Sequence, residues 1–151
     1  MDKNKQWIDL IVELQGLAQV GLTYGKDVYD KERYERIRDI SAEMMAELSG
    51  LQVEKVKDLF CNETGYQTPK IDTRAAIFKE GKILLAHENN GTWSLPGGWC
   101  DVNVSVTENT IKEVKEEAGL DVSVKSVIAI QDREKHNLPV YAYRVCKIFM
   151  L

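Results

Sequence analysis

The sequence predicts an α/β protein of the α+β type, in which a small helical region precedes a domain of strands and helices. Apolar residues recur at helical spacing through about residues 7–60. From Thr68 onward, short apolar runs alternate with turns that contain glycine or asparagine, which is the pattern of strands and hairpins. We therefore expect a helical extension over residues 1–67 and an α/β domain over residues 68–151.

Three helices are predicted in the extension. The apolar stripe of the first helix consists of Trp7, Ile11, Leu14, Ala18 and Leu22. The second helix begins near Asp30, a suitable N-cap residue, and a short third helix runs from Val53 to Phe60. Such stripes usually form a core, but they also suit a surface that contacts a partner helix.

Several strands are predicted in the α/β domain. Residues 73–78 and 83–87 form a hairpin, and later strands lie near residues 122–130 and from Tyr141 onward, with a loop at 134–139. The chain stops at Leu151 inside an apolar run, where an unfinished strand would leave backbone groups unpaired. We therefore expect that further C-terminal sequence belongs to this domain.

The composition argues against several classes of protein. The chain has 151 residues and a formal net charge of −4, which does not favour binding to nucleic acid or to anionic membranes. No apolar run is long enough to span a membrane, and the N-terminus does not have the pattern of a signal peptide. The three cysteines form no closely spaced pair, which favours reduced thiols in the cytoplasm over disulfides or a zinc site.

One helix of the α/β domain is marked clearly at both ends. Ser105 and Glu108 have the spacing of a capping box, and Gly119 suits the left-handed conformation that ends a helix. The buried stripe of this helix consists of Ile111, Val114 and Ala118.

Three glutamates on this helix are either metal ligands or part of a solvated helix face. Glu113, Glu116 and Glu117 lie within roughly 100° of arc, where their charges repel one another and the helix dipole disfavours them further. A bound Mg²⁺ or Mn²⁺ would reverse that repulsion, because hard cations prefer oxygen ligands. The alternative is a solvated helix face, in which Lys112 pairs with Glu108 and Glu116.

The residues around this helix resemble the Nudix hydrolases. In that signature a glycine is followed by five residues, a glutamate, seven residues, Arg-Glu, an aliphatic residue, any residue, Glu-Glu, any residue, Gly and an aliphatic residue. The matching positions, which follow the LPGG turn at residues 95–98, are Gly98, Glu113, Val114, Glu116, Glu117, Gly119 and Leu120. Val104 replaces the first glutamate and Lys112 replaces the arginine, which places metal affinity and rate in question more than the fold.

The resemblance implies an α/β/α sandwich with a mixed sheet and a metal-dependent hydrolase. Glu113, Glu116, Glu117 and the Gly97 carbonyl are the implied ligands of Mg²⁺ or Mn²⁺, and Glu116 and Glu113 are the candidate catalytic residues. Gly98, Lys112 and Gly119 would support this geometry. The helical extension is similar to that of enzymes acting on a nucleoside diphosphate linked to a group X, such as ADP-ribose and CDP-choline pyrophosphatases. The implied products are a nucleoside monophosphate and phosphorylated X.

Four residues are candidates for substrate contacts. Arg74 either contacts a phosphate or ribose or is an exposed strand charge, and Trp99 either stacks on a base or packs in the core. Asp132 and Arg133 either meet the substrate or belong to a solvated loop. His87 is expected to be structural, and Cys100 is a poor candidate nucleophile.

Two further hypotheses follow from the departures and from the extension. Because Val104 and Lys112 differ from the signature, the domain is alternatively a weakly active or inactive nucleotide sensor. The helical extension is expected to make the protein a homodimer, with a small nucleotide as its ligand.

Overall fold

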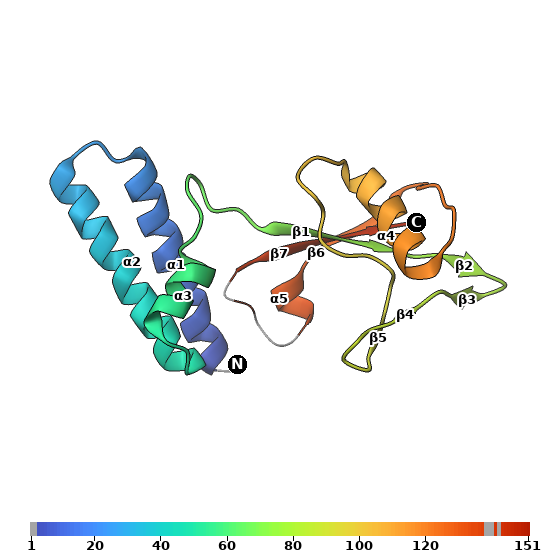
Figure 1. The fold of residues 1–151 in the computed structure, drawn as a ribbon, viewed down its shortest axis with the longest axis horizontal. Helices are drawn as coiled ribbons and strands as arrows, with labels where there is room; N and C mark the ends of the chain where they lie inside the picture. Colours follow the sequence, from blue (N-terminus) through green and yellow to red (C-terminus); the bar gives the residue numbers. More distant parts are fainter. Residues whose placement is uncertain (1–2, 138–140, 142) are drawn as a thin grey trace. The chain divides into compact units, whose positions relative to one another are not determined.

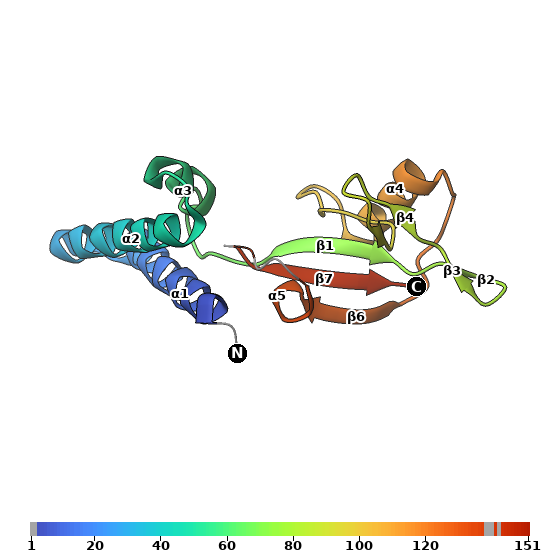
Figure 2. The same cartoon turned by 90° about the horizontal axis from the view of Figure 1, so that it is seen from below.

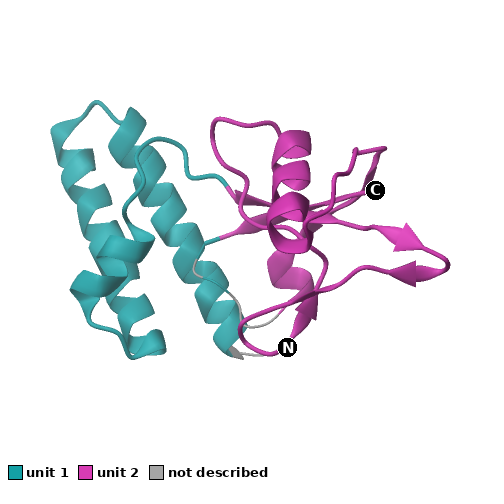
Figure 3. Ribbon diagram, turned by 45° about the vertical axis from the view of Figure 1, so that its right-hand side comes forward, with its two compact units in different colours: residues 1–68, 140–143 teal, residues 69–139, 144–151 magenta. Residues whose placement is uncertain are grey.

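The computed structural model describes residues 3–137, 141 and 143–151. The chain divides into two compact units, one formed by residues 1–68 with 140–143 and the other by residues 69–139 with 144–151 (Figure 3). Each unit has its own core, and the two are described separately below.

The first unit contains three helices, which are α1 (Lys3–Tyr24), α2 (Val28–Ser49) and α3 (Val53–Phe60) (Figure 1). Helix α2 begins one turn earlier than the sequence suggests, because Asp27 is its N-cap and accepts a hydrogen bond from the Asp30 amide at 3.0 Å. The left-handed Gly50 ends α2. The core of the unit consists of Ile11, Ala42, Met45, Ala46, Val56 and Phe60.

The predicted stripe of α1 is only partly buried. Ile11 and Ala18 are buried together with Gln15 and Gln19, whereas Trp7 is 51% exposed. The buried face of α1 therefore differs from the predicted one, since it includes the two glutamines and leaves out Trp7. Most of the apolar side chains of this core come from α2 and α3.

The second unit is built on a mixed sheet with the order β1-β7-β6. Strand β1 (Lys70–Ala75) is parallel to β7 (Val145–Met150), and β6 (Val127–Asp132) is antiparallel to β7. Helix α4 (Val106–Ala118) lies on one face of this sheet, next to β1 (Figure 2). The N-terminal helices and the mixed sheet confirm the predicted fold class.

Short elements complete the second unit. Two hairpins are formed by β2 (Phe78–Lys79) with β3 (Lys82–Ile83) and by β4 (Ala86–His87) with β5 (Trp93–Ser94). The predicted strand at 73–78 is therefore divided, and the strand predicted near 122–130 begins only at Val127. The loop predicted at 134–139 begins with a helical turn, α5 (Arg133–His136), and residues 138–140 lie outside the described residues.

The last strand is not an unpaired edge of the sheet, which corrects the expectation that its backbone groups lack partners. Strand β7 is the central strand, hydrogen-bonded to β1 on one side and to β6 on the other. Beyond it, the Leu151 amide donates to Ser126 O at 2.8 Å and Leu151 O accepts from the Lys125 amide at 2.7 Å. The apolar run at the chain end is thus paired inside the sheet, because both neighbours come from earlier in the sequence.

Candidate active site

Residues 95–98 form a turn, called the glycine turn below. This turn and the residues after it are hydrogen-bonded to the side of β1 that faces away from β7. The Ala75 amide donates to Pro96 O at 2.8 Å, the Thr73 amide to Gly98 O at 2.8 Å, and the Cys100 amide to Ile71 O at 2.9 Å. Gly97 has a φ of 145°, and a Cβ at this residue would lie 1.9 Å from Thr73 O. Only glycine therefore allows the turn to approach β1 this closely.

The caps of α4 are those that the sequence predicts. The Glu108 amide donates to Ser105 Oγ at 3.1 Å and the Ser105 amide donates to Glu108 Oε2 at 2.8 Å, which completes the capping box. Hydrogen bonding of the Glu108 carboxylate to the backbone and the side chain of Ser105 lowers the pKa of Glu108. Gly119 ends the helix with a φ of 69°. Local sequence alone thus determines where the three glutamates stand along the helix.

Asn109 connects α4 to the sheet and was missed by sequence reasoning. Its Nδ2 donates to Thr73 Oγ1 at 2.9 Å, and its Oδ1 accepts from the Asp101 amide at 3.3 Å. Asn109 and Thr73 are both fully buried. The signal in the sequence was its place four residues before Glu113, on the same face of the helix.

Glu113 is the innermost of the three predicted metal ligands. Its carboxylate lies over Gly98, where an added Cβ would approach Oε2 to 2.7 Å. Burial raises the pKa of Glu113, and repulsion from Glu116 and Glu117 raises it further, while Lys112 opposes the shift. The helix therefore holds an acid next to the glycine turn in a setting that disfavours its ionised form.

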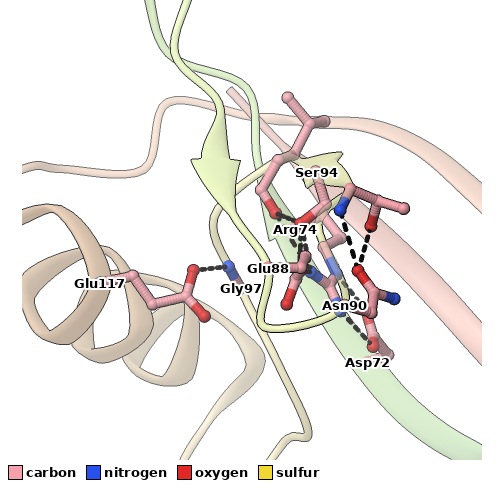
Figure 4. Close-up of polar contacts among 9 residues, drawn as sticks. Asp72, Arg74, Glu88, Asn90, Ser94, Gly97 and Glu117 are labelled. Carbon is pink, nitrogen blue, oxygen red and sulfur yellow. Dashed lines mark hydrogen bonds and ion pairs between the residues drawn. The ribbon is translucent and has the colours of Figure 1, made fainter.

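Glu116 and Glu117 are exposed near the end of α4. Glu117 Oε2 accepts a hydrogen bond from the Gly97 amide at 3.0 Å, which joins the helix to the glycine turn (Figure 4). Among the described residues, no three acidic, histidine or cysteine side chains converge closely enough to hold a metal ion. The donor set suits a hard cation, but its oxygens do not surround one point in this conformation.

Lys112 does not pair with Glu108 or Glu116 as the alternative interpretation of the helix supposed. Its ammonium group lies 2.8 Å from Asp101 Oδ2, and this hydrogen bond raises the pKa of Lys112. Glu108 is engaged in the capping box instead. The pair with Asp101 joins α4 to the loop before it, eleven residues away in the sequence.

The Arg74 side chain is only 15% exposed, which corrects its interpretation as an exposed strand charge. Its Nε and Nη2 donate to the two carboxylate oxygens of Asp72 at 2.7 and 3.0 Å (Figure 4). Its Nη1 donates to Leu95 O at 3.1 Å and to Ser94 Oγ at 3.3 Å. Hydrogen bonding to Asp72 raises the pKa of Arg74 despite the opposing effect of burial.

A cleft of about 490 Å³ opens beside the glycine turn. Glu88, Asn89 and Pro96 line it together with Glu117 and the residues of β4. Glu88 accepts a hydrogen bond from Ser94 Oγ and lies 3.6 Å from Arg74 Nη1. Nothing in the local sequence marked Glu88, because its role depends on the hairpin that brings it to Arg74.

The remaining candidates are spread over the unit. Arg133 is buried at the start of α5, which contradicts the solvated loop, while the exposed Asp132 forms an ion pair with Lys135 at 2.6 Å. Trp99 is half-exposed next to the turn. The rings of His87 and Trp93 pack in a tilted arrangement, with centroids 4.8 Å apart and an interplanar angle of 59°. Burial raises the pKa of the Cys100 thiol, and Asp101 adds to the shift.

Comparison with known proteins places both parts of the chain. Residues 68–148 match the NUDIX domain, and residues 5–60 match the UDP-X-like, N-terminal oligomerisation domain. A putative ADP-ribose pyrophosphatase of Bacillus subtilis is 44% identical over 96% of this chain and 70% of its own length. An ADP-ribose pyrophosphatase of Methanocaldococcus jannaschii is 36% identical over 43% of this chain and 41% of its own.

One solved structure is similar in both sequence and fold. The crystal structure of an ADP-ribose pyrophosphatase from Streptococcus suis is 63% identical over 55% of this chain, with a TM-score of 0.50. The match spans 58% of that protein, so the chain corresponds to a little more than half of its length. Together with the two domain matches, these similarities show that the chain belongs to the Nudix hydrolase family.

Proposed function

We propose that this protein is a magnesium-dependent pyrophosphatase that hydrolyses a nucleoside diphosphate linked to a second group X. The supporting observation is the placement of Glu113, Glu116 and Glu117 on α4 beside the turn formed by Gly97 and Gly98. The products would be a nucleoside monophosphate and phosphorylated X. The names of the Bacillus and Streptococcus relatives favour ADP-ribose over CDP-choline as the first substrate to test.

The donor set supports a divalent cation at this place. The repulsion that raises the pKa of Glu113 would be relieved by a positive charge among the three carboxylates. Glu113, Glu116 and Glu117 would hold Mg²⁺ or Mn²⁺, and the Gly97 carbonyl is a further candidate ligand. When bound, the cation would neutralise charge on the diphosphate and acidify water.

The chain's own residues would bind and orient the substrate. Glu116 is exposed at the end of α4, where its carboxylate is free to orient or deprotonate a water molecule. Glu113 is held over Gly98 and is the second candidate catalytic residue. The half-exposed Trp99 is proposed to stack on the base, and the exposed Asp132 stays a candidate for contact with X. The buried Arg133 lies 4.0 Å from Glu134. Its role in substrate binding remains a prediction.

Product analysis with a panel of substrates tests the proposal. The full chain is incubated with Mg²⁺ and with ADP-ribose, CDP-choline or a UDP-sugar, and release of the monophosphate is measured. We expect Glu116→Gln to lower kcat by about 100-fold or more, in line with general-base effects. Glu47→Gln, an exposed change on α2, serves as the control. Nucleotide binding without product from any substrate would instead support the sensor that Val104 and Lys112 suggest.

We also propose that the helical extension over residues 1–67 makes the protein a homodimer, while residues 68–151 form the hydrolase domain. Four exposed apolar side chains lie along α1 at spacings of three and seven residues: Trp7, Leu10, Leu17 and Tyr24. The match to an oligomerisation domain supports this use of the helices.

The dimer is tested by sedimentation of two matched variants. Leu17 and Leu59 are similarly exposed, at 61% and 55%, but lie on α1 and α3 respectively. Leu17→Glu should yield monomers and Leu59→Glu should not. A dimer that survives Leu17→Glu would argue against α1 as the interface.

A cytoplasmic location is part of the proposal. Cys61, Cys100 and Cys146 are all free thiols, which is the state expected in a reducing compartment. None of the helices within residues 3–137, 141 and 143–151 combines the length and apolar character that crossing a bilayer requires.

A further inference from the structure

We propose that Arg74 is a positioning residue, which fixes the turn at residues 95–98 so that the Gly97 amide holds Glu117. The catalytic consequence of this role rests on the proposed function, but the positioning itself does not. Arg74 stands on β1, outside the signature helix, and its guanidinium group connects the strand to the segment that carries the turn (Figure 4).

One side of the guanidinium group is held rigidly by the strand. Asp72 accepts two hydrogen bonds from Arg74, at 2.7 and 3.0 Å, in the parallel geometry that a planar fork allows. The two side chains are only 8% and 15% exposed, so solvent screens the pair weakly. A lysine could carry the same charge at this position but could not form both bonds at once.

The other side of the group faces the glycine turn. Nη1 donates to Leu95 O at 3.1 Å and to Ser94 Oγ at 3.3 Å, and Glu88 Oε1 lies 3.6 Å away. Ser94 Oγ in turn donates to Glu88 Oε1, so that Ser94 of β5 and Glu88, the residue that follows β4, meet at Arg74. The guanidinium group thus anchors the start of the turn.

The end of the turn is anchored to the helix. Gly97 follows Leu95 by two residues, and its amide donates to Glu117 Oε2 at 3.0 Å. A shift at Leu95 would therefore move the amide that restrains Glu117. Displacements of about 1 Å in a catalytic site change rates by about 100-fold, which is enough to make this restraint important.

The same contacts argue against a direct bond from Arg74 to the substrate. The hydrogen bonds to Asp72, Ser94 and Leu95 use Nε, Nη1 and one side of Nη2. Only one Nη2 hydrogen is left, so a phosphate could not bind through two parallel hydrogen bonds without displacing a buried carboxylate or a backbone carbonyl, which would lose its charged donor. The arrangement therefore suits positioning better than ligand exchange.

The test uses Arg74→Lys, with Arg33→Lys as the matched control. Arg33 also pairs with an aspartate, Asp30 at 2.7 Å, but on the exposed surface of α2. The first readout is the Gly97 amide resonance of the full chain without metal or nucleotide. We expect Arg74→Lys and Glu117→Gln each to shift it, and the double variant to shift it less than the sum of the two. Arg33→Lys should leave it unchanged.

Kinetics with Mg²⁺ and ADP-ribose provide the second readout. Arg74→Lys should lower kcat by about tenfold or more, raise the Mg²⁺ concentration for half-maximal rate, and change KM by less than about threefold. A raised KM with unchanged kcat and an unshifted Gly97 resonance would identify Arg74 as a substrate ligand and overturn the proposal.

Misfolding of Arg74→Lys and inactivity of the wild-type protein would each leave the role of Arg74 testable. If Arg74→Lys does not fold, Ser94→Ala removes one contact of the same guanidinium group, and an unshifted Gly97 resonance in that variant would also overturn the proposal. If the wild-type protein hydrolyses none of the substrates, the proposed function fails, while the resonance measurements still decide whether Arg74 positions the turn.

Discussion

The carboxylate of Glu113 lies directly over Gly98, at a place where a methyl group would approach Oε2 to 2.7 Å. The neighbouring Gly97 instead faces the backbone of β1, with Thr73 O 1.9 Å from the position of an added Cβ. Two adjacent glycines are thus required for different reasons, one by the side chain of Glu113 and the other by the sheet. Their alanine variants should separate activity from folding.

Gly98→Ala should impair hydrolysis while the fold persists. The group in its way is the end of a flexible side chain, which can move at little cost in stability, but Glu113 then leaves its place beside the turn. We expect kcat to fall by about tenfold or more and the free energy of unfolding to change by less than about 1 kcal/mol. Gly16→Ala, whose Cβ would meet nothing closer than 3.8 Å, is the control. Full activity in Gly98→Ala would remove Glu113 from the site.

Gly97→Ala should fail to fold. Its Cβ would collide with Thr73 O and with Thr73 C at 2.8 Å, and neither can rotate away because both belong to a paired strand. We expect a loss of more than about 4 kcal/mol, a large part of the stability of a typical domain. Urea unfolding or the yield of folded protein measures this loss. A Gly97→Ala protein as stable as the wild type would show that the turn does not approach β1 this closely.

Glu113→Gln should stabilise the metal-free protein at neutral pH while abolishing hydrolysis. Because the folded-state pKa of Glu113 is raised, ionisation destabilises the native state above that pKa and has no such effect below the unfolded value of about 4.3. The melting temperature of the variant should therefore exceed that of the wild type at pH 8, and the difference should disappear near pH 4. Thermal unfolding in a chelating buffer measures it. If the difference in melting temperature did not change across this pH range, its cause would not be the ionisation of Glu113.

Thr73→Val should destabilise the second unit through Asn109. The substitution keeps the shape of the side chain but removes the acceptor of the 2.9 Å hydrogen bond from Asn109 Nδ2, which is buried. An orphaned buried donor costs about 1–3 kcal/mol, and chemical denaturation would measure this loss. Thr107→Val, an exposed change on α4, should alter stability by less than about 0.5 kcal/mol. Equal effects of the two substitutions would show that the bond to Asn109 does not stabilise the fold.

The elements that could be predicted are those governed by near neighbours in the sequence. The capping box of Ser105 with Glu108 and the left-handed Gly119 lie where the sequence placed them, because caps depend on residues three or four positions apart. The strands were predicted less well. The run at 73–78 ends as a strand at Ala75, since the register with β7 ends there, opposite Met150, and the last hydrogen bond to β7 comes from the Ala76 amide.

The errors at single residues have a common origin. One of the two interpretations of Arg74, an exposed strand charge, was wrong because its partners Ser94 and Leu95 are 20 and 21 residues away. Arg133 looked solvated because the turn at α5 was not expected, and Lys112 was given a helix neighbour although Asp101 lies closer in space. Glu88 and Asn109 carried no local signal strong enough to mark them.

By itself the sequence determined one helix, its limits, and the acidic face that Glu113, Glu116 and Glu117 share, because helical periodicity and capping act over a few residues. Only the tertiary structure decided what that face meets. The contacts of Gly97 with Glu117 and of Thr73 with Asn109 join residues 20 and 36 positions apart. Such pairs depend on how strands and helix pack, and packing is a property of the whole chain rather than of any short segment.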